Sequence, residues 1–385
     1  MKLSNLKLYL PFWGISFSLL IDLIIVVTTL IINKQIKGLQ SWFNAKIVFA
    51  FLVFTFFESI IVLSLGYDYY KFAQQLFLVT IFYSIYIKYG RIIVQNIENA
   101  IEKYILFSVT LSLCALVKYF LGYTVGGRAC SWSGEPGDLS LLILPAIIYY
   151  VDQRKVDTKC LIIVLTFVLA SSSASFLALF LTLFILVFDK YKRKVLRMLG
   201  YITIFLCMVI PLYMRVADNE EEPSVIKKYS ETYKTLKESH TSIEDYELLN
   251  ASSYAWLTNI EVSLKAPYRL IGTGLGTHYC SYEKIYPDSG YRLYGLNKED
   301  AYSLLIRIFS EFGIIGLAVV YLYLKKNFNS KNTLNIMSLS YIINSFITGG
   351  HYAVRGIVLF VVLYYLTSNK KKNGKKETVC VNCNC

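Results

Sequence analysis

The chain has 385 residues, of which 55% are hydrophobic and only 17% charged, and its formal net charge is +13. Soluble domains average about 25% charged residues, so this composition excludes an ordinary soluble enzyme and indicates an integral membrane protein. Most of the excess Lys and Arg lies in short connections between apolar segments, as in the cytoplasmic loops of membrane proteins. Because no soluble basic domain is present, we expect no nucleic-acid partner.

Apolar segments of the length that crosses a bilayer, about 20 residues, recur along the chain. Counted by this length, they predict an all-α polytopic integral membrane protein with about 11 transmembrane helices. The first span has no small-residue cleavage site after a short apolar core, so we expect it to be retained. The clear spans are about 8–32, 46–66, 71–88, 104–122, 138–152, 197–215, 303–324, 334–350 and 353–368.

The segment 160–188 is too long for one span and short for two. Both flanking segments, 152–159 and 190–194, are basic and therefore belong on the cytoplasmic side. Two cytoplasmic ends require an even number of crossings, which predicts a hairpin of two short helices that turns at the serine cluster 171–175. We expect 88–103 to be a cytoplasmic amphipathic helix. The same rule puts 123–137, 216–302 and the turn around His351 outside, and 324–332 and 367–376 inside.

This topology divides the chain into four regions. An N-terminal transmembrane bundle spans 1–215, and a large extracytoplasmic loop spans 216–302. C-terminal transmembrane helices follow over 303–368, and a basic cytoplasmic tail closes the chain over 369–385.

The cysteines do not form an obvious framework. Cys130 and Cys280 both fall in predicted external segments, which leaves a disulfide between them open. The tail ends in the spacing C-x2-C-x-C, which we interpret as part of a solvated tail rather than a metal or lipidation site, because no matching ligand set exists elsewhere. The external segments hold no paired C-x2-C or H-E-x-x-H motif, so we expect no metal and no cofactor.

One stretch, Ile271–Leu317, combines a glycine cluster with a polar segment and an apolar helix that carries Arg307 and Glu311. A lone G-x-G is weak evidence for a phosphate loop, so we interpret the glycines as a tight approach of the backbone. Arg307 and Glu311 share one helix face and must point into a bundle interior or a wet cavity. Both a substrate-binding role and a mutual ion pair are open. Glu58, deep in the second span, is another buried polar candidate.

Arg128 lies in the external segment GRACSWSGEPGDLS, followed by Glu135 and Pro136 at the start of the next helix. The planar donor fork of arginine suits phosphate oxygens, so Arg128 is a candidate anion ligand. The alternative is a salt bridge between Arg128 and Glu135 that only ties the loop.

Two histidines are candidates on the same predicted face. His278 follows the glycine cluster, and it is either a general base or a structural histidine. His351 lies in the turn GGHYAVRG together with Arg355, which places both on the outer surface with Arg128.

Two parts of the chain resemble the O-antigen polymerase and O-antigen ligase family of bacterial envelope glycosyltransferases. The first is GRACSWSGEPGDLSLLILPAIIYY (127–150), which looks like the family's Arg-, Gly- and Pro-containing segment before a short span. The second is AWLTNIEVSLKAPYRLIGTGLG (255–276) with AYSLLIRIFSEFGIIGLAVVYLYL (301–324), which looks like its glycine motif, loop end and Glu-x-Gly-x-x-Gly span.

The resemblance implies a metal-independent, inverting enzyme in the bacterial cytoplasmic (inner) membrane, with its active site on the extracytoplasmic side. Such an enzyme is a polymerase that joins oligosaccharide repeat units, carried on a polyprenyl diphosphate such as undecaprenyl diphosphate, into O-antigen, capsular or exopolysaccharide. Its implied partners are the lipid-linked oligosaccharide, the lipid bilayer, a chain-length regulator and a flippase of the same pathway.

The resemblance also implies roles for particular residues. Arg128 would hold the diphosphate, with Arg355 or Arg292 as a second cation. His278, Glu299 or Asp300 would take the proton of the acceptor hydroxyl.

Two departures separate the chain from the family's ligases. Where those ligases typically carry His, this sequence has Tyr302 and Ser303, which favours a polymerase. Where the family often carries Arg before the loop's Trp, it has Ser252 and Ser253. A ligase that uses another acceptor and a flippase or transporter for lipid-linked oligosaccharide are the alternatives, although a flippase is expected to line a central cavity with charge through both leaflets.

Overall fold

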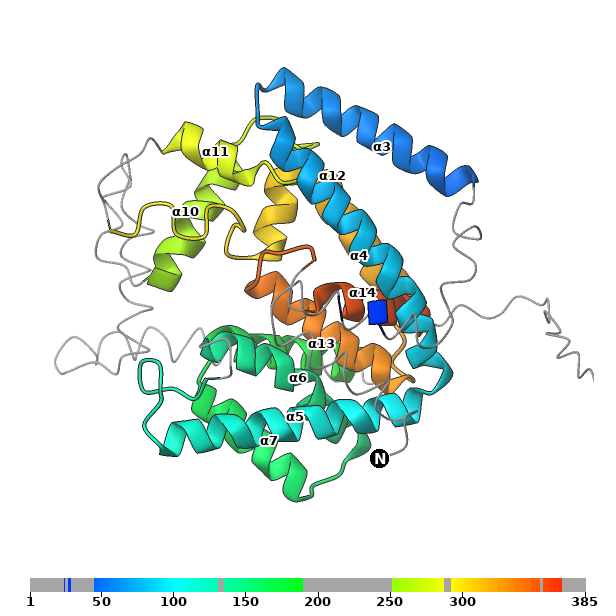
Figure 1. The fold of residues 1–385 in the computed structure, drawn as a ribbon, viewed down its shortest axis with the longest axis vertical. Helices are drawn as coiled ribbons and strands as arrows, with labels where there is room; N and C mark the ends of the chain where they lie inside the picture. Colours follow the sequence, from blue (N-terminus) through cyan, green and yellow to red (C-terminus); the bar gives the residue numbers. More distant parts are fainter. Residues whose placement is uncertain are drawn as a thin grey trace, which may run out of the picture.

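The computed structural model describes residues 24, 27, 28, 45–130, 135–189, 251–286, 292–353 and 356–368. The regular elements within these ranges are α-helices, as the sequence predicts, and their arrangement is shown in Figure 1. They are α3 (Ala45–Ser64), α4 (Tyr69–Gln95), α5 (Ile97–Phe120), α6 (Pro136–Gln153), α7 (Thr158–Ala170), an unlabelled helix (Ser173–Asp189), α10 (Ala251–Lys265), α11 (His278–Ile285), α12 (Leu304–Asn327), α13 (Thr333–Ile347) and α14 (Ile357–Leu366).

Three of these helices, α4, α5 and α12, are long and apolar enough to cross a membrane. Several others, including α7, α13, α14 and Ser173–Asp189, are apolar but shorter. This composition supports a helical membrane protein. The predicted span 197–215 and the tail 369–385 lie outside the described residues, as does most of the predicted span 8–32.

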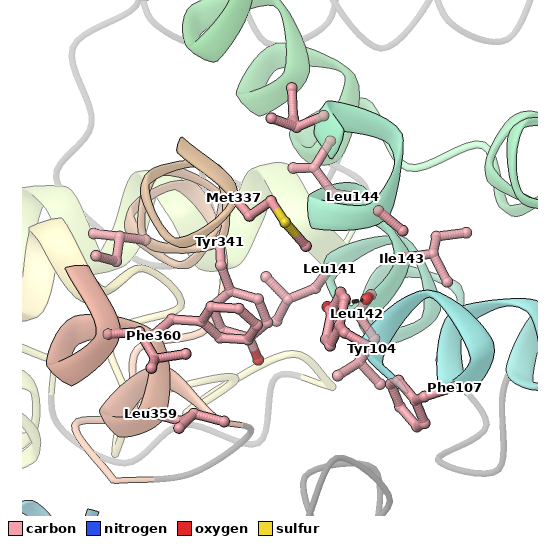
Figure 2. Packing of buried hydrophobic residues seen from close by; sticks show 14 of the residues in the cluster. Tyr104, Phe107, Leu141, Leu142, Ile143, Leu144, Met337, Tyr341, Leu359 and Phe360 are labelled. Carbon is pink, nitrogen blue, oxygen red and sulfur yellow. Dashed lines mark hydrogen bonds between the residues drawn. The ribbon is translucent and has the colours of Figure 1, made fainter. Parts of the chain in front are cut away.

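The main apolar core lies where α6, α13 and α14 meet α5. Figure 2 shows Tyr341 of α13 stacked on Phe360 of α14, with ring centroids 4.0 Å apart, and Tyr104 of α5 beside them. Leu141 and Leu144 of α6 fill the other side of this cluster. Helices that are apolar on every side bury themselves in this way inside a bundle.

The segment 160–188, where the sequence predicts a hairpin, contains two short helices joined by a turn at the serine cluster. α7 ends at Ala170, the chain reverses through Ser171, whose φ of 45° is left-handed, and the next helix begins at Ser173. Phe167 and Phe176 pack across the turn with ring centroids 4.9 Å apart.

The separate surface helix predicted at 88–103 is wrong. α4 continues through Gln95 and α5 begins at Ile97, so the segment is the junction of two long helices. The reason is that its apolar residues face the core on both sides of Asn96, with Ile93 and Ile101 buried.

Contacts between connections sort the ends of the helices into two groups. At one end, Ala129 N donates to Leu169 O (3.0 Å), Gly349 N donates to Tyr302 O (3.0 Å), and Lys71 pairs with Glu299 (3.4 Å). We call this the Tyr302 end. At the other, hydrogen bonds join Thr333 to Asp152 (2.6 Å), Ser330 to Asp189 (2.7 Å) and Asn329 to Thr367 O (2.9 Å). The positive-inside rule, applied to the sequence, assigns these two groups of connections to opposite sides of the membrane.

The disulfide left open by the sequence is not formed. Cys130 and Cys280 are both free thiols. Cys130 is buried beside the carbonyl of Tyr123, whereas Cys280 lies in α11.

α12 is interrupted in its middle. Gly313 adopts φ 62° and ψ −157°, which breaks the helical backbone and removes the hydrogen bonds that the helix would otherwise make there. Residues 269–274 replace those bonds from outside the helix. The four that do so are Thr273 N to Ser310 O (3.1 Å), Gly274 N to Glu311 O (2.9 Å), Ile314 N to Arg269 O (3.0 Å) and Ile315 N to Leu270 O (3.1 Å).

Glycines make this docking possible. A Cβ on Gly272 would overlap the backbone of Glu311, and one on Gly313 would overlap the backbone of Leu270. Both positions also have positive φ, which disfavours other residues. The sequence predicts a tight approach of this backbone to the membrane-facing site, and the structure shows a tight approach to the backbone of α12.

Replacing Gly272 with Ala tests the docking. We expect a loss of about 3 kcal/mol in unfolding free energy, because left-handed strain adds to a clash with the backbone of Glu311. Gly122→Ala is the matched control, since Gly122 has a similar φ (+84° against +81°) and nothing within 4 Å of its would-be Cβ. Thermal unfolding in detergent measures both, and equal losses would contradict the docking.

Candidate functional site

Arg307 and Glu311 form an ion pair inside the protein. Arg307 Nε lies 2.9 Å from Glu311 Oε1, and the two side chains are 3% and 0% exposed. The pair also reaches the turn between α13 and α14, since Arg307 Nη1 donates to Gly350 O (2.8 Å) and Tyr352 Oη donates to Glu311 Oε2 (2.8 Å). The guanidinium lies 4.7 Å from the centroid of the Tyr352 ring. Of the two interpretations left open, the structure contains the mutual ion pair, which leaves Arg307 little surface for a substrate.

Glu58 is buried, as predicted, and joins α3 to the docked loop. Its Oε2 accepts a hydrogen bond from Leu275 N at 3.1 Å. Gly274 lies against the same carboxylate and against Val62 of α3. Residues 269–275, which we call the glycine loop, therefore lie between α12 and α3 and contact both.

His278 lies at the start of α11 and is fully buried. Its Nε2 is 2.8 Å from Asn259 Oδ1 and its Nδ1 is 2.8 Å from Ser310 Oγ. Asn259 Nδ2 donates to Ala255 O (2.6 Å), so its Oδ1 is the acceptor and His278 Nε2 carries the proton. Nδ1 then accepts from the hydroxyl of Ser310. Burial, with a further contribution from the positive charge of Arg307, lowers the pKa of His278 to about 3.

This placement argues against the predicted role of His278 as general base. Its only basic nitrogen is already hydrogen-bonded to Ser310, and the ring has no exposed surface for a substrate to reach. Instead, His278 links α10, α11 and α12 through neutral hydrogen bonds, which is the structural alternative.

The structure brings Asp300 and His351 together at the Tyr302 end. His351 Nε2 lies 3.3 Å from Asp300 Oδ2, and the side chains are 38% and 16% exposed. Asp300 is itself fixed, because its Oδ1 accepts from Asn297 Nδ2 (3.0 Å) and from Tyr302 N (3.1 Å). The two partners are far apart in sequence and lie on either side of α12 and α13, so no local motif could have paired them.

The backbone next to this pair is strained. Ala301 and Tyr302 have φ values of 57° and 60°, a left-handed conformation that disfavours residues with a Cβ by about 1–2 kcal/mol each. Such strain persists only where surrounding contacts impose it, and it is often found at functional sites. Here the hydrogen bonds of Asp300 and Gly349 supply those contacts.

The pKa of Tyr302 depends on several neighbours, including Glu135. Burial raises the pKa of Tyr302, a hydrogen bond from Ser252 opposes the shift, and the charges of Asp300 and Glu135 add to it. Glu135 at the start of α6 therefore lies within electrostatic reach of Tyr302. Ser252, at the position where the resembled family often carries Arg, also contacts Tyr302.

The remaining predicted residues are dispersed. Glu299 is exposed and pairs with Lys71 of α4. It takes no part in the contact between Asp300 and His351. Arg128 and Arg292 are exposed, and within the described ranges neither forms an ion pair with Asp300 or Glu135. Arg355 lies outside the described residues. In the part of the chain that the structure describes, no group of three His, Cys, Asp or Glu side chains is placed to hold a metal ion.

Comparison with known proteins gives no assignment. No protein-family model matches the chain, and no curated protein is detectably similar to it. The function must therefore be argued from the site itself.

The pKa of His278 predicts how stability depends on pH. The unfolded imidazole, with a pKa of 6.5, binds a proton that the folded one, with a pKa of about 3, does not. Stability is therefore complete above pH 6.5 and falls by about 1.4 kcal/mol per pH unit as the pH drops from there toward 3.

Thermal unfolding in detergent at about pH 7 and about pH 5 measures this loss. His278→Gln keeps a donor toward Asn259 but cannot be protonated, so its unfolding should depend less steeply on pH. The same slope in both proteins would contradict the assignment of a buried neutral imidazole.

Proposed function

We propose that this protein is a membrane glycosyltransferase, a polymerase that joins polyprenyl-diphosphate-linked oligosaccharide repeat units at the outer face of the bacterial cytoplasmic membrane. The observation that carries the proposal is the partly exposed Asp300–His351 pair beside Tyr302. The pair lies at the Tyr302 end of a helical fold in which three helices are long and apolar enough to cross a membrane.

The position of His351 bears on the main difference between this chain and the resembled family, which is the missing histidine. That resemblance leads one to expect a histidine near Tyr302 and Ser303, where this chain has none. His351, from the turn between α13 and α14, contacts Asp300 just before these residues. An imidazole is thus available at the expected place, supplied by a different segment of the chain.

The geometry supports general base catalysis. In the proposed mechanism, the carboxylate of Asp300 orients the imidazole through His351 Nε2, and the other ring nitrogen, Nδ1, takes the proton of an acceptor hydroxyl. That hydroxyl oxygen then attacks the anomeric carbon of the donor sugar from the face opposite the diphosphate. The bond from the anomeric carbon to the diphosphate oxygen breaks, the electron pair leaves with the diphosphate, and the configuration inverts.

The leaving diphosphate gains negative charge and needs a cation. Arg128 is exposed, belongs to the connection that leads into Glu135 and α6, and has no ion-pair partner among the described residues. Its planar guanidinium can bind two phosphate oxygens at once. Electrostatic stabilisation of this kind is usually the largest contribution to such a reaction.

Two other functions remain candidates for specific reasons. The first is a ligase, which would use the same donor with a different acceptor. The sequence argues against a ligase because it has no histidine near Tyr302, and the nearby imidazole of His351 weakens that argument. The interrupted α12 is typical of transporters, where free backbone groups at the break bind substrate or ions. Here hydrogen bonds to residues 269–274 occupy those backbone groups, which favours the transferase.

Substitution of the pair tests the proposal. Asp300→Asn and His351→Gln should each lower polymer formation by about 100-fold or more, so that single repeat units accumulate on the lipid carrier. Gel analysis of glycolipids from a complemented deletion strain measures the products. Glu299→Gln removes the neighbouring carboxylate, which pairs with Lys71 instead, and should keep long chains.

Normal chain length in both Asp300→Asn and His351→Gln would refute the catalytic pair. Long chains that persist while transfer to their final acceptor is lost would identify a ligase instead.

Arg128 has its own test. Arg128→Ala and Arg128→Lys should both leave the protein in the membrane and abolish long-chain polysaccharide, because neither side chain can bind two phosphate oxygens in a planar fork. Immunoblotting of membranes controls for insertion, and normal polymer in both variants would rule out the diphosphate role.

Cysteine labelling tests the topology. Tyr123 and Val156 are 67% and 80% exposed and belong to opposite ends of the helices. In a background without other reactive cysteines, a membrane-impermeant maleimide should label Tyr123→Cys on intact cells and should label Val156→Cys only after lysis. Labelling of Val156→Cys on intact cells would overturn the predicted sidedness.

A further inference from the structure

The buried Arg307–Glu311 pair holds both chain neighbours of His351. Arg307 Nη1 donates to the carbonyl of Gly350 (2.8 Å), and Glu311 Oε2 accepts from the hydroxyl of Tyr352 (2.8 Å). The ring of Tyr352 also packs against the guanidinium, at 4.7 Å from its centroid. His351 lies between these two anchored residues and makes its own contact with Asp300.

The turn that carries His351 is pressed against the Asp300 segment. A Cβ on Gly350 would overlap the carbonyl of Asp300, so only glycine fits there. Gly349 N donates to Tyr302 O (3.0 Å), which joins the same two segments a second time. The backbone on both sides of the Asp300–His351 contact is therefore held by short-range contacts.

The anchor is itself rigid. Glu311 lies immediately before the break in α12, and its carbonyl accepts from Gly274 N at 2.9 Å. A buried ion pair resists rearrangement, since separating its partners would leave a buried charge uncompensated.

We propose that Arg307, Glu311 and Tyr352 are positioning residues that hold the imidazole of His351 in line with the carboxylate of Asp300. That His351 is the catalytic base rests on the proposed function. That these three residues hold its side chain in place rests on the contacts alone. The proposal gives the buried charged pair of α12, Arg307 and Glu311, a role in orienting the base, in place of the substrate-binding role that the sequence left open beside a mutual ion pair.

Tyr352→Phe is the sharpest variant, because it removes the bond to Glu311 and keeps the aromatic ring beside Arg307. Tyr364→Phe is the matched control. Tyr364 is more deeply buried than Tyr352, and its hydroxyl also donates to α12, to Leu324 O at 2.7 Å, but at the other end of that helix. Both variants lose one buried hydrogen bond, worth about 1 kcal/mol, so both should fold.

The first measurement is polymerisation of purified lipid-linked repeat units. Tyr352→Phe should lower kcat by about 10-fold with KM nearly unchanged, because orientation of the base matters in the transition state and not for substrate binding. Tyr364→Phe should keep the wild-type kcat. Equal kcat values for Tyr352→Phe, Tyr364→Phe and the wild type would overturn the proposal.

The second measurement does not depend on activity. The chain has three histidines, so the imidazole signals of ¹³C-labelled protein can be assigned by substituting each in turn. In Tyr352→Phe, the His351 signals should move toward those of a solvated histidine, whereas in Tyr364→Phe they should stay in place.

These NMR signals separate the two proposals. If the wild-type protein has no polymerase activity but the His351 signals move as expected, the proposed function fails and the positioning network stands. If the signals are identical in Tyr352→Phe and the wild type, the positioning network fails whatever the activity.

Discussion

The docking of residues 269–274 onto the break in α12 is the constraint on which the rest of the structure depends. In a membrane helix, unpaired backbone groups are strongly destabilising, and an interrupted helix is tolerated only where other parts of the protein pair with it. The glycine loop provides that pairing, and it also contacts Glu58 of α3. The sharp turn at Gly313 directly follows the segment that carries Arg307 and Glu311, whose side chains then reach the α13–α14 turn.

Two kinds of polar group therefore lie in and beside α12 and differ in what they can do. The interior groups, Arg307, Glu311 and His278, have their charges or ring nitrogens fully engaged with protein partners. Asp300 and His351 at the Tyr302 end contact each other and retain exposed surface. Chemistry on a soluble or lipid-borne substrate requires the second kind, while the first fixes the geometry around it.

The sequence predicted features that depend on local pattern and charge. The hairpin at 160–188, the buried Glu58 and the tight approach of the glycines follow from span length, hydrocarbon energetics and glycine's lack of a Cβ. It left alternatives open where partners lie far apart in the chain. His278 stands beside the glycine cluster and looks available, yet its exposure is set by Asn259 and Ser310 from other helices. The pairing of Asp300 with His351 likewise depends on how α12 and α13 fold back, which no spacing in the sequence reveals.

The position of the glycine loop relative to α12 has a consequence for biosynthesis. Residues 269–274 leave the ribosome before residues 310–315, so the groups that satisfy the break in α12 already exist when that helix is synthesised. If α12 crosses a membrane, as its length and composition allow, the loop could pair with it before free carbonyl and amide groups meet hydrocarbon. The order of these two segments along the chain is thus itself a safeguard for assembly, since the reverse order would require the broken helix to wait unpaired for its partner.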